Sequence, residues 1–299
     1  MSMNKKAFNK LYIYCNLALV LTAFISGLSF VAQKLGMNYV EPFTFNTLRC
    51  FIGAISLLPA MFLFSDKKTL TKGGLLAGLV LFIGFSVNQY CMIYADAGKA
   101  GFITSLYILF VPVIAVFLKH KLSDNVKYSI VIALVGLYLL CAKNFTHFEL
   151  WDIFLLVSAF FFALHIIIVS HYSRKSDAIK LSIVQFLTAG TLSFPFMLIF
   201  DKPETSMIIA GWKPILFIGI IVTGVAYTLQ IFGHKATKPV LATLILSLEA
   251  VFAVLAGVVL LGETLNPKEI CGCIVMLCAI ILSQMPDKPK GGKNETDFR

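Results

Sequence analysis

Long stretches of apolar residues, separated by short charged or turn-rich segments, follow one another along the chain from residue 11 to residue 285. Each stretch is about 17–23 residues long, which is the length that an α-helix needs to cross the ~30 Å hydrocarbon core of a membrane. We predict ten spans, at residues 11–33, 43–64, 74–95, 101–118, 126–142, 151–170, 180–200, 212–232, 240–261 and 268–285. The pattern indicates an all-α integral membrane protein.

The composition agrees with this interpretation. Of the 299 residues, 59% are apolar and 13% are charged, and the mean hydropathy is +0.87. Soluble domains have about 25% charged residues, so the composition excludes a soluble enzyme, a disordered protein and a secreted disulfide scaffold. Most of the seven cysteines lie in apolar stretches, and Cys271-Gly-Cys273 has no second cysteine pair with which to bind a metal. We therefore expect no metal and no cofactor.

The basic residues predict how the chain is oriented. With ten spans, 18 of the 25 Lys and Arg residues fall on the side of the N-terminus and six on the other, while Arg49 lies within a span. This split follows the positive-inside rule and predicts that both termini are cytoplasmic, in the inner membrane of a cell. The net charge of +10 is thus a topology signal, and we expect no nucleic-acid partner. Residues 286–299 form a polar tail that we expect to be disordered in the cytoplasm.

The two halves of the chain resemble each other weakly but in order. A shift of 132 residues places Gln33 over His165, a shift of 136 places Arg49 over Gln185, and a shift of 138 places residues 104–106 over 242–244. Ten spans then divide into two repeats of five, at 1–146 and 147–285. Because five is odd, the two repeats have opposite orientation in the membrane, and such repeats form a site between them near the midplane.

Three segments carry a resemblance to a known family. GKAGFITSLYILFVPVIAVFL at 98–118, TKPVLATLILSLEAVFAVLAGVVLLGETL at 237–265 and the arginine in FNTLRCFIGAISLLP at 45–59 resemble the EamA family of the drug/metabolite transporter superfamily. The resemblance implies ten helices in two inverted five-helix bundles. It also implies a metabolite exporter or exchanger without a bound cofactor. Substrates vary widely in that family, so the resemblance does not name one.

Two charged residues lie deep within predicted spans, Arg49 and Glu249. A charge at the centre of a bilayer costs about 2.5–3.5 kcal/mol on the insertion scale, so such residues are candidates for function. Their depths differ by only ~6 Å at 1.5 Å per residue. They are predicted to form a pair or to be two separate anchors for substrate. A structural salt bridge that only joins two helices stays open as an alternative.

Other polar residues in the spans complete the predicted substrate-binding cavity. Gln33 and His165 occupy matched places in the two repeats, as do Arg49 and Gln185. Hydrogen bonds between helices, or tyrosines at the membrane interface, are the alternative explanation for these residues. The full predicted set is Gln33, Arg49, Gln89, Tyr94, Ser105, Tyr107, His165, Gln185, Tyr227, Gln230 and Glu249.

These patterns predict a secondary transporter and no enzyme. The predicted substrate is a small metabolite, an amino acid or a related amphipathic compound, exported or exchanged by alternating access. An intramembrane lipid-modifying enzyme and a channel or accessory subunit are the alternatives. The first would need a catalytic pair or metal set and the second a ring of like polar residues, and neither is visible. The sequence leaves open whether the chain forms a homodimer.

Overall fold

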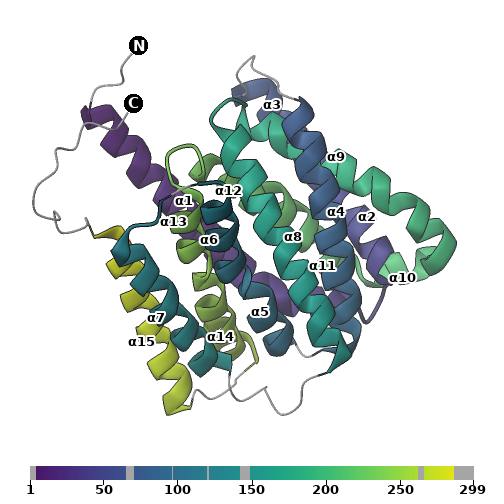
Figure 1. Ribbon diagram of the computed structural model, residues 1–299. Coiled ribbons are helices and arrows are strands. Elements are labelled where there is room, and N and C mark those ends of the chain that lie inside the picture. Colours follow the sequence, from purple (N-terminus) through teal and green to yellow (C-terminus); the bar gives the residue numbers. More distant parts are fainter. Residues whose placement is uncertain are drawn as a thin grey trace, which may run out of the picture.

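The computed structural model describes residues 5–64, 71–95, 97–119, 121–141, 149–261 and 266–285, and these residues form helices and no strand (Figure 1). The predicted tail at 286–299 lies outside them. The helices are α1 (Lys5–Gly36), α2 (Pro42–Ser56), α3 (Leu58–Phe64), α4 (Thr71–Tyr94), α5 (Ala97–Ser105), α6 (Tyr107–Phe117), α7 (Asp124–Cys141), α8 (Leu150–Ser173), α9 (Ala178–Phe196), η2 (Met197–Asp201), α10 (Thr205–Ala210), α11 (Trp212–Leu216), η3 (Phe217–Ala226), α12 (Tyr227–Gly233), α13 (Pro239–Leu246), α14 (Leu248–Leu261) and α15 (Pro267–Gln284).

The all-helical membrane fold predicted from the sequence is confirmed. Among the described residues, nine helical segments are long and apolar enough to cross a membrane, and several of them join two or three of the helices above. Apolar side chains such as Phe62, Phe117 and Val259 are about four-fifths exposed, as expected for a surface that faces lipid. The span predicted at 126–142 corresponds to α7, which is outside these nine, so the count of ten stays a prediction.

The sequence marks where several helices begin. Proline occupies the first turn of α2, α13 and α15, where its missing N–H leaves no helical hydrogen bond unmade. Asp177 caps α9 by accepting hydrogen bonds from the backbone N–H groups of residues 179 and 180. Such local signals fix the helix ends, while packing fixes how the helices are arranged.

Two of the membrane-spanning segments are interrupted halfway. Leu106 separates α5 from α6, and Ser247 separates α13 from α14. At each interruption the backbone keeps right-handed helical dihedral angles but makes an i→i+3 hydrogen bond, from the N–H of Leu109 to the carbonyl of Leu106 and from the N–H of Ala250 to that of Ser247. Each span therefore continues through a distorted turn. The helix α6 continues through Pro112, so the interruption precedes the proline. Broken helices are tolerated in membranes where they line a cavity, because protein groups then satisfy the freed backbone.

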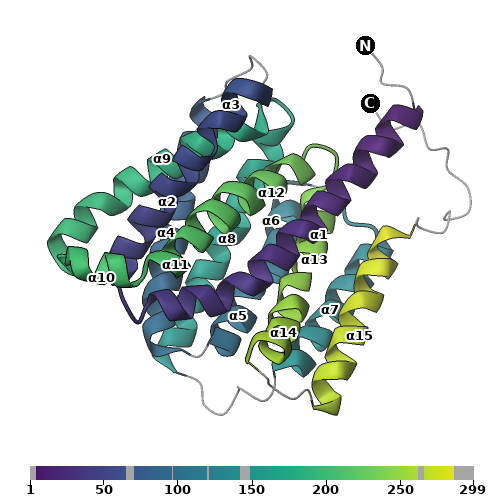
Figure 2. The same ribbon diagram turned by 180° about the vertical axis from the view of Figure 1, so that it is seen from behind.

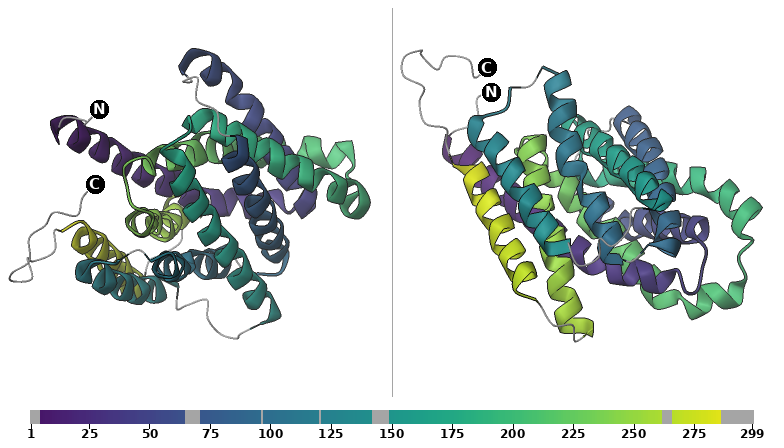
Figure 3. Two further views of the ribbon diagram at one scale, coloured as in Figure 1. Left: turned by 45° about the horizontal axis from the view of Figure 1, so that its top comes forward. Right: turned by 60° about the horizontal axis from the view of Figure 1, so that its bottom comes forward.

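The long helix α1 crosses the molecule diagonally and packs against α12, α13, α14 and η3 (Figure 2). On one side α4 packs against α8 and α9, and α2 packs against α9 and η3. The pair α7 and α15 lies on the opposite flank, away from α2 and α9 (Figure 3). The start of α1 and the end of α15 lie at the same end of the molecule, since Tyr12 OH donates a hydrogen bond to Gln284 Oε1 at 2.7 Å.

Two glycines allow α7 and α15 to approach closely. A Cβ atom at Gly272 would lie 2.7 Å from the backbone nitrogen of Leu140 and 2.8 Å from the carbonyl oxygen of Gly136. Backbone atoms cannot move aside as a flexible side chain can. Small residues at such crossings are a common basis of helix association in membranes.

We therefore expect Gly272→Ala to lower the free energy of unfolding by about 1–3 kcal/mol, the usual cost of overpacking. Thermal unfolding of the purified protein in detergent measures this. Gly101→Ala is the matched control, because the nearest atom to a Cβ there is Phe30 Cε1 at 3.5 Å, an ordinary contact. Equal unfolding temperatures for the two variants would contradict the close approach.

Candidate functional site

Arg49 lies in the middle of α2 and is only 2% exposed. Its Nε atom donates to Thr223 Oγ1 of η3 at 3.1 Å, and Nη1 donates to Gln33 Oε1 of α1 at 3.4 Å. The guanidinium carbon lies 4.1 Å from the centre of the Phe85 ring. In the described part of the chain it forms no ion pair with a carboxylate. A buried positive charge is thus held by neutral groups and by an aromatic face alone.

The polar residues of α1 form one stripe along the helix. Thr22, Ser26, Ser29 and Gln33 follow one another at spacings of four, three and four residues, which places them on one face of the helix. All four line the central cavity described below. Gln33 donates through Nε2 to Ser29 Oγ at 3.0 Å while its Oε1 accepts from Arg49, so this stripe orients the arginine.

A corresponding pair occurs in the second half of the chain. His165 of α8 and Gln185 of α9 are both buried, and His165 Nε2 lies 3.0 Å from Gln185 Oε1 in a hydrogen bond. These are the residues that the sequence comparison matches to Gln33 and Arg49, which are themselves hydrogen-bonded. Both matched pairs are therefore hydrogen-bonded, but in opposite directions: Gln33 accepts from Arg49, whereas Gln185 Oε1 accepts from His165.

Glu249 links the two interrupted spans by hydrogen bonds near Leu106 and Ser247. It lies in the first turn of α14, directly after the break at Ser247. Its Oε1 atom accepts hydrogen bonds from Ser105 Oγ at 3.2 Å and from Tyr107 OH at 2.9 Å, and these two residues flank the break at Leu106. Glu249 Oε2 has no hydrogen-bond partner among the described residues. One carboxylate oxygen thus ties two broken helices together.

Aromatic side chains form the wall between Arg49 and the second half of the chain. The Phe85 ring, on which Arg49 lies, meets the rings of Phe162 and Tyr227 edge to face at 5.9 and 5.6 Å. Tyr227 also contacts the His165 ring at 5.9 Å. Edge-to-face pairs of this kind stabilise the packing of the rings by about 0.5–1.5 kcal/mol each.

These groups surround one hollow, which we term the central cavity, with a volume of about 80 Å³. It has room for several water molecules but is smaller than the ~300 Å³ at which pockets for drug-sized ligands begin. Arg49 and Glu249 both line it and form no ion pair with each other. The lining consists of Thr22, Ser26, Ser29, Phe30, Gln33, Arg49, Phe85, Asn88, Thr104, Tyr107, Phe162, His165, Ile166, Val222, Tyr227, Gln230, Leu246 and Glu249.

The structure brings most of the predicted site residues together. Ser105 and Gln185 lie one layer behind the cavity and hydrogen-bond to residues that line it. The residues of the predicted set that line the cavity directly are Gln33, Arg49, Tyr107, His165, Tyr227, Gln230 and Glu249. Whether these residues bind substrate stays a prediction.

Two predicted residues lie elsewhere. Tyr94 is half exposed on α4 and stacks on Trp151 with ring centres 4.0 Å apart, so it does not line the cavity. Gln89 is buried, but its neighbour Asn88 faces the cavity in its place and donates to Thr104 Oγ1 at 2.8 Å. Adjacent helical residues point about 100° apart, and the sequence alone did not decide which of the two faces inward.

Sequence reasoning overlooked several lining residues. The stripe at Thr22, Ser26 and Ser29 was detectable, because a polar residue every three or four positions in an apolar span marks one helix face. Phe85 and Phe162 carried no such signal among the 27 phenylalanines of the chain. Their role follows only from the fold, which places them beside Arg49.

The comparisons with known proteins agree with this architecture. The model of the EamA-like transporter family matches the chain at residues 13–142 and again at 149–285. The chain belongs to the EamA-like transporter family. It is similar to an uncharacterized transporter of Archaeoglobus fulgidus, with 34% identity over 271 residues, covering 90% of this chain and 85% of the relative. The family resemblance seen in the sequence is therefore confirmed.

More distant relatives of this EamA-like transporter are also named as transporters. An uncharacterized transporter of Bacillus subtilis is 23% identical and is matched over 89% of this chain and 95% of its own length. The GDP-fucose transporter 1 of Dictyostelium discoideum is 23% identical over 81% of this chain and 67% of its own. One solved crystal structure superposes with a TM-score of 0.77 at 16% identity, covering 90% of this chain and 96% of the other, which shows the same fold.

The bonds to Glu249 make a prediction about stability. Tyr107→Phe removes one of the two donors to a carboxylate inside the protein, so we expect the free energy of unfolding to fall by about 1.5–3 kcal/mol. Thermal unfolding in detergent measures the change. Tyr138→Phe removes a hydroxyl from an exposed tyrosine of α7 outside the cavity and should leave the unfolding temperature unchanged. A Tyr107→Phe variant as stable as the parent would contradict the bond to Glu249.

Proposed function

We propose that this EamA-like transporter moves a small zwitterion, an amino acid or a related amphipathic compound, by alternating access through the central cavity. The observation that carries this proposal is that Arg49 and Glu249 line the same cavity without pairing with each other. A cavity lined by one buried cation and one partly buried anion complements a substrate that carries both charges.

Arg49 is the proposed anchor for the carboxylate of the substrate. Burying a guanidinium without a counter-ion costs several kcal/mol, and the neutral partners Thr223, Gln33 and Phe85 offset only part of this cost. A carboxylate that enters the cavity supplies the missing negative charge, and arginine can hold it in a bidentate arrangement. Because Arg49 lines the cavity, it attracts the anionic group of a substrate that enters there.

Glu249 is the proposed anchor for the amine. Its Oε1 atom is occupied by Ser105 and Tyr107, which leaves Oε2 for a charged donor from the substrate. Because Glu249 also links the two spans at their distorted turns, an amine bound there would act directly on both of them. This gives the proposed carrier a link between substrate binding and helix movement.

The two-repeat organisation, with parts 1–146 and 147–285, is part of the proposal. Three observations support it. The family model matches the chain twice, the hydrogen bond between Gln33 and Arg49 has its counterpart between His165 and Gln185, and helix contacts recur in pairs. For example, α1 packs on α14 as α8 packs on α6, and α2 packs on η3 as α9 packs on α4. Inverted repeats that enclose a central site are the usual framework of alternating access.

We further propose that the protein lies in the inner membrane of a cell with both termini in the cytoplasm. The excess of basic residues on one side supports this orientation, and the start of α1 meets the end of α15 at one end of the molecule. The direction of flux, export or exchange, follows from the gradients in the cell.

A nucleotide sugar is a second substrate class to test, because one relative is named a GDP-fucose transporter. A central cavity of about 80 Å³ favours a much smaller molecule. The channel and enzyme alternatives also belong in the test. Saturable uptake with counterflow identifies a carrier, whereas a channel shows neither.

Reconstituted transport tests the assignment of Arg49 and Glu249. In proteoliposomes loaded with a panel of amino acids and a nucleotide sugar, counterflow identifies the substrate. We expect Arg49→Gln and Glu249→Gln each to weaken transport about 10- to 150-fold, the equivalent of losing one charge-assisted interaction of ~1.5–3 kcal/mol. An analogue without the carboxylate should inhibit substrate counterflow equally well in the parent and in Arg49→Gln. An analogue without the amine should inhibit it equally well in the parent and in Glu249→Gln.

The controls remove exposed charges of the same types. Lys213→Gln and Glu204→Gln lie outside the central cavity and should transport at the parent rate. Normal transport by both cavity variants, with the proteins folded as judged by gel filtration, would show that these residues do not bind the substrate.

Reporter fusions test the orientation separately. A reporter that is active only in the cytoplasm should be active at the N-terminus and at the C-terminus. One fused in the connection between α9 and α10, beside Lys202, should be inactive, because that segment lies on the side with few basic residues. Activity at only one of the two termini would rule out an even number of spans.

A further inference from the structure

A second hollow lies at the end of the molecule where α1 begins and α15 ends. Its volume is about 560 Å³, several times that of the central cavity. Its walls come from the start of α1, the segment before α7, the end of α8, the start of α13 and the end of α15. We term it the basic hollow, because three cationic side chains line it: Lys121, Arg174 and Lys238.

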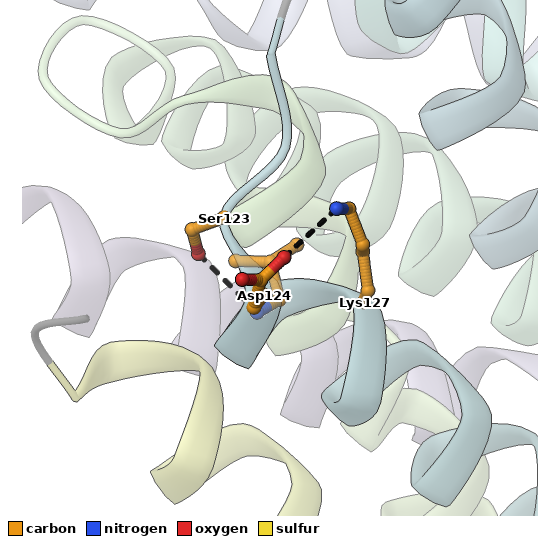
Figure 4. A network of polar contacts seen from close by, with 4 residues as sticks. Ser123, Asp124 and Lys127 are labelled. Carbon is orange, nitrogen blue, oxygen red and sulfur yellow. Dashed lines mark hydrogen bonds and ion pairs between the residues drawn. The ribbon is translucent and has the colours of Figure 1, made fainter. Parts of the chain in front are cut away.

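The charge of the basic hollow has one sign. Among the described residues that line it, none is acidic. Asp124, close by at the start of α7, forms an ion pair with Lys127 at 2.9 Å and does not belong to the lining (Figure 4). Ser123 accepts a hydrogen bond from the backbone N–H of Val126, which fixes this edge of the hollow. Cations from three separate segments therefore converge on one space.

The hollow also has an apolar side. Ala115, Val126 and Val240 line it together with the first turn of α13. That first turn presents the positive end of the helix dipole, which adds to the attraction for an anion. A space lined by both cationic and apolar side chains, where several helices begin or end, matches a molecule with a phosphate head and an apolar body.

We propose that the basic hollow binds a phosphate-bearing anion, with its phosphate against Lys121, Arg174 and Lys238. The headgroup of an anionic membrane lipid fits best, since its glycerol and upper chain segments would cover the apolar wall. A soluble phosphate ester carries the same recognition chemistry and is distinguished from the lipid by experiment.

This site is separate from the proposed substrate site. The two hollows share no lining residue. Lipid binding there requires neither the proposed substrate nor the proposed roles of Arg49 and Glu249. Failure of one proposal therefore leaves the other intact.

Native mass spectrometry of the purified protein in a neutral detergent tests the proposal. The probes are short-chain phosphatidylglycerol, short-chain phosphatidylcholine, glycerol 3-phosphate and inorganic phosphate. We expect one phosphatidylglycerol to bind per chain in preference to phosphatidylcholine. The triple variant Lys121→Gln, Arg174→Gln and Lys238→Gln should bind it about a hundredfold more weakly, from ~1 kcal/mol per basic residue.

The matched control removes three basic residues from the same end of the molecule without touching the hollow. Lys72→Gln, Lys175→Gln and Lys235→Gln together change the net charge equally, and none of these residues lines the hollow. We expect less than about a threefold loss in this variant, because salt screens the attraction between the lipid phosphate and charges outside the hollow.

Each possible result of the binding measurements supports or overturns the proposed phosphate site. Selective loss of phosphatidylglycerol in the hollow variant supports a lipid site. Equal competition by glycerol 3-phosphate supports the phosphate site with a soluble ligand. Equal losses in both variants, or no preference for phosphatidylglycerol over phosphatidylcholine, would overturn the proposal. Thermal unfolding of each variant without lipid confirms that it is folded.

Discussion

The energy of an unpaired charge inside a membrane protein is the constraint on which this structure depends. Arg49 is 2% exposed and has no carboxylate partner among the described residues, so three different helices must supply the groups that hold it. Gln33 from α1, Thr223 from η3 and Phe85 from α4 all converge on one guanidinium. Groups from these helices therefore replace the water molecules that would solvate the guanidinium outside the membrane. This requirement explains why the helices meet at the centre of the molecule.

The sequence predicted the fold better than it predicted the cavity. Span length sufficed to predict an all-helical membrane protein, because the thickness of the bilayer imposes that length directly on the chain. The interruptions at Leu106 and Ser247 were not predicted. Neither position is a proline or glycine, and the breaks are stabilised by Glu249, which belongs to only one of the two segments. Contacts between residues far apart in the chain cannot be predicted from a local pattern of residues.

Within the cavity, the sequence succeeded where a residue was chemically unusual for its span and failed where orientation mattered. A charge or histidine in hydrocarbon is conspicuous, and Arg49, Glu249 and His165 all line the cavity. Asn88 and Gln89 are chemically alike, and only the packing of α4 decides that the first faces inward. Weak internal similarity did more, since it matched Gln33 and Arg49 to His165 and Gln185, and the members of each pair are in contact.

The short helix α13 has a consequence for how the protein responds to its surroundings. Its first turn forms part of the basic hollow, and its last residue, Leu246, lines the central cavity. A rigid rod of eight residues cannot tilt at one end without moving the other. A ligand that tilts α13 in one hollow would therefore also move a wall of the other, and such a coupling between two sites is always mutual. The composition of the surrounding bilayer would in this way become an effector of the carrier.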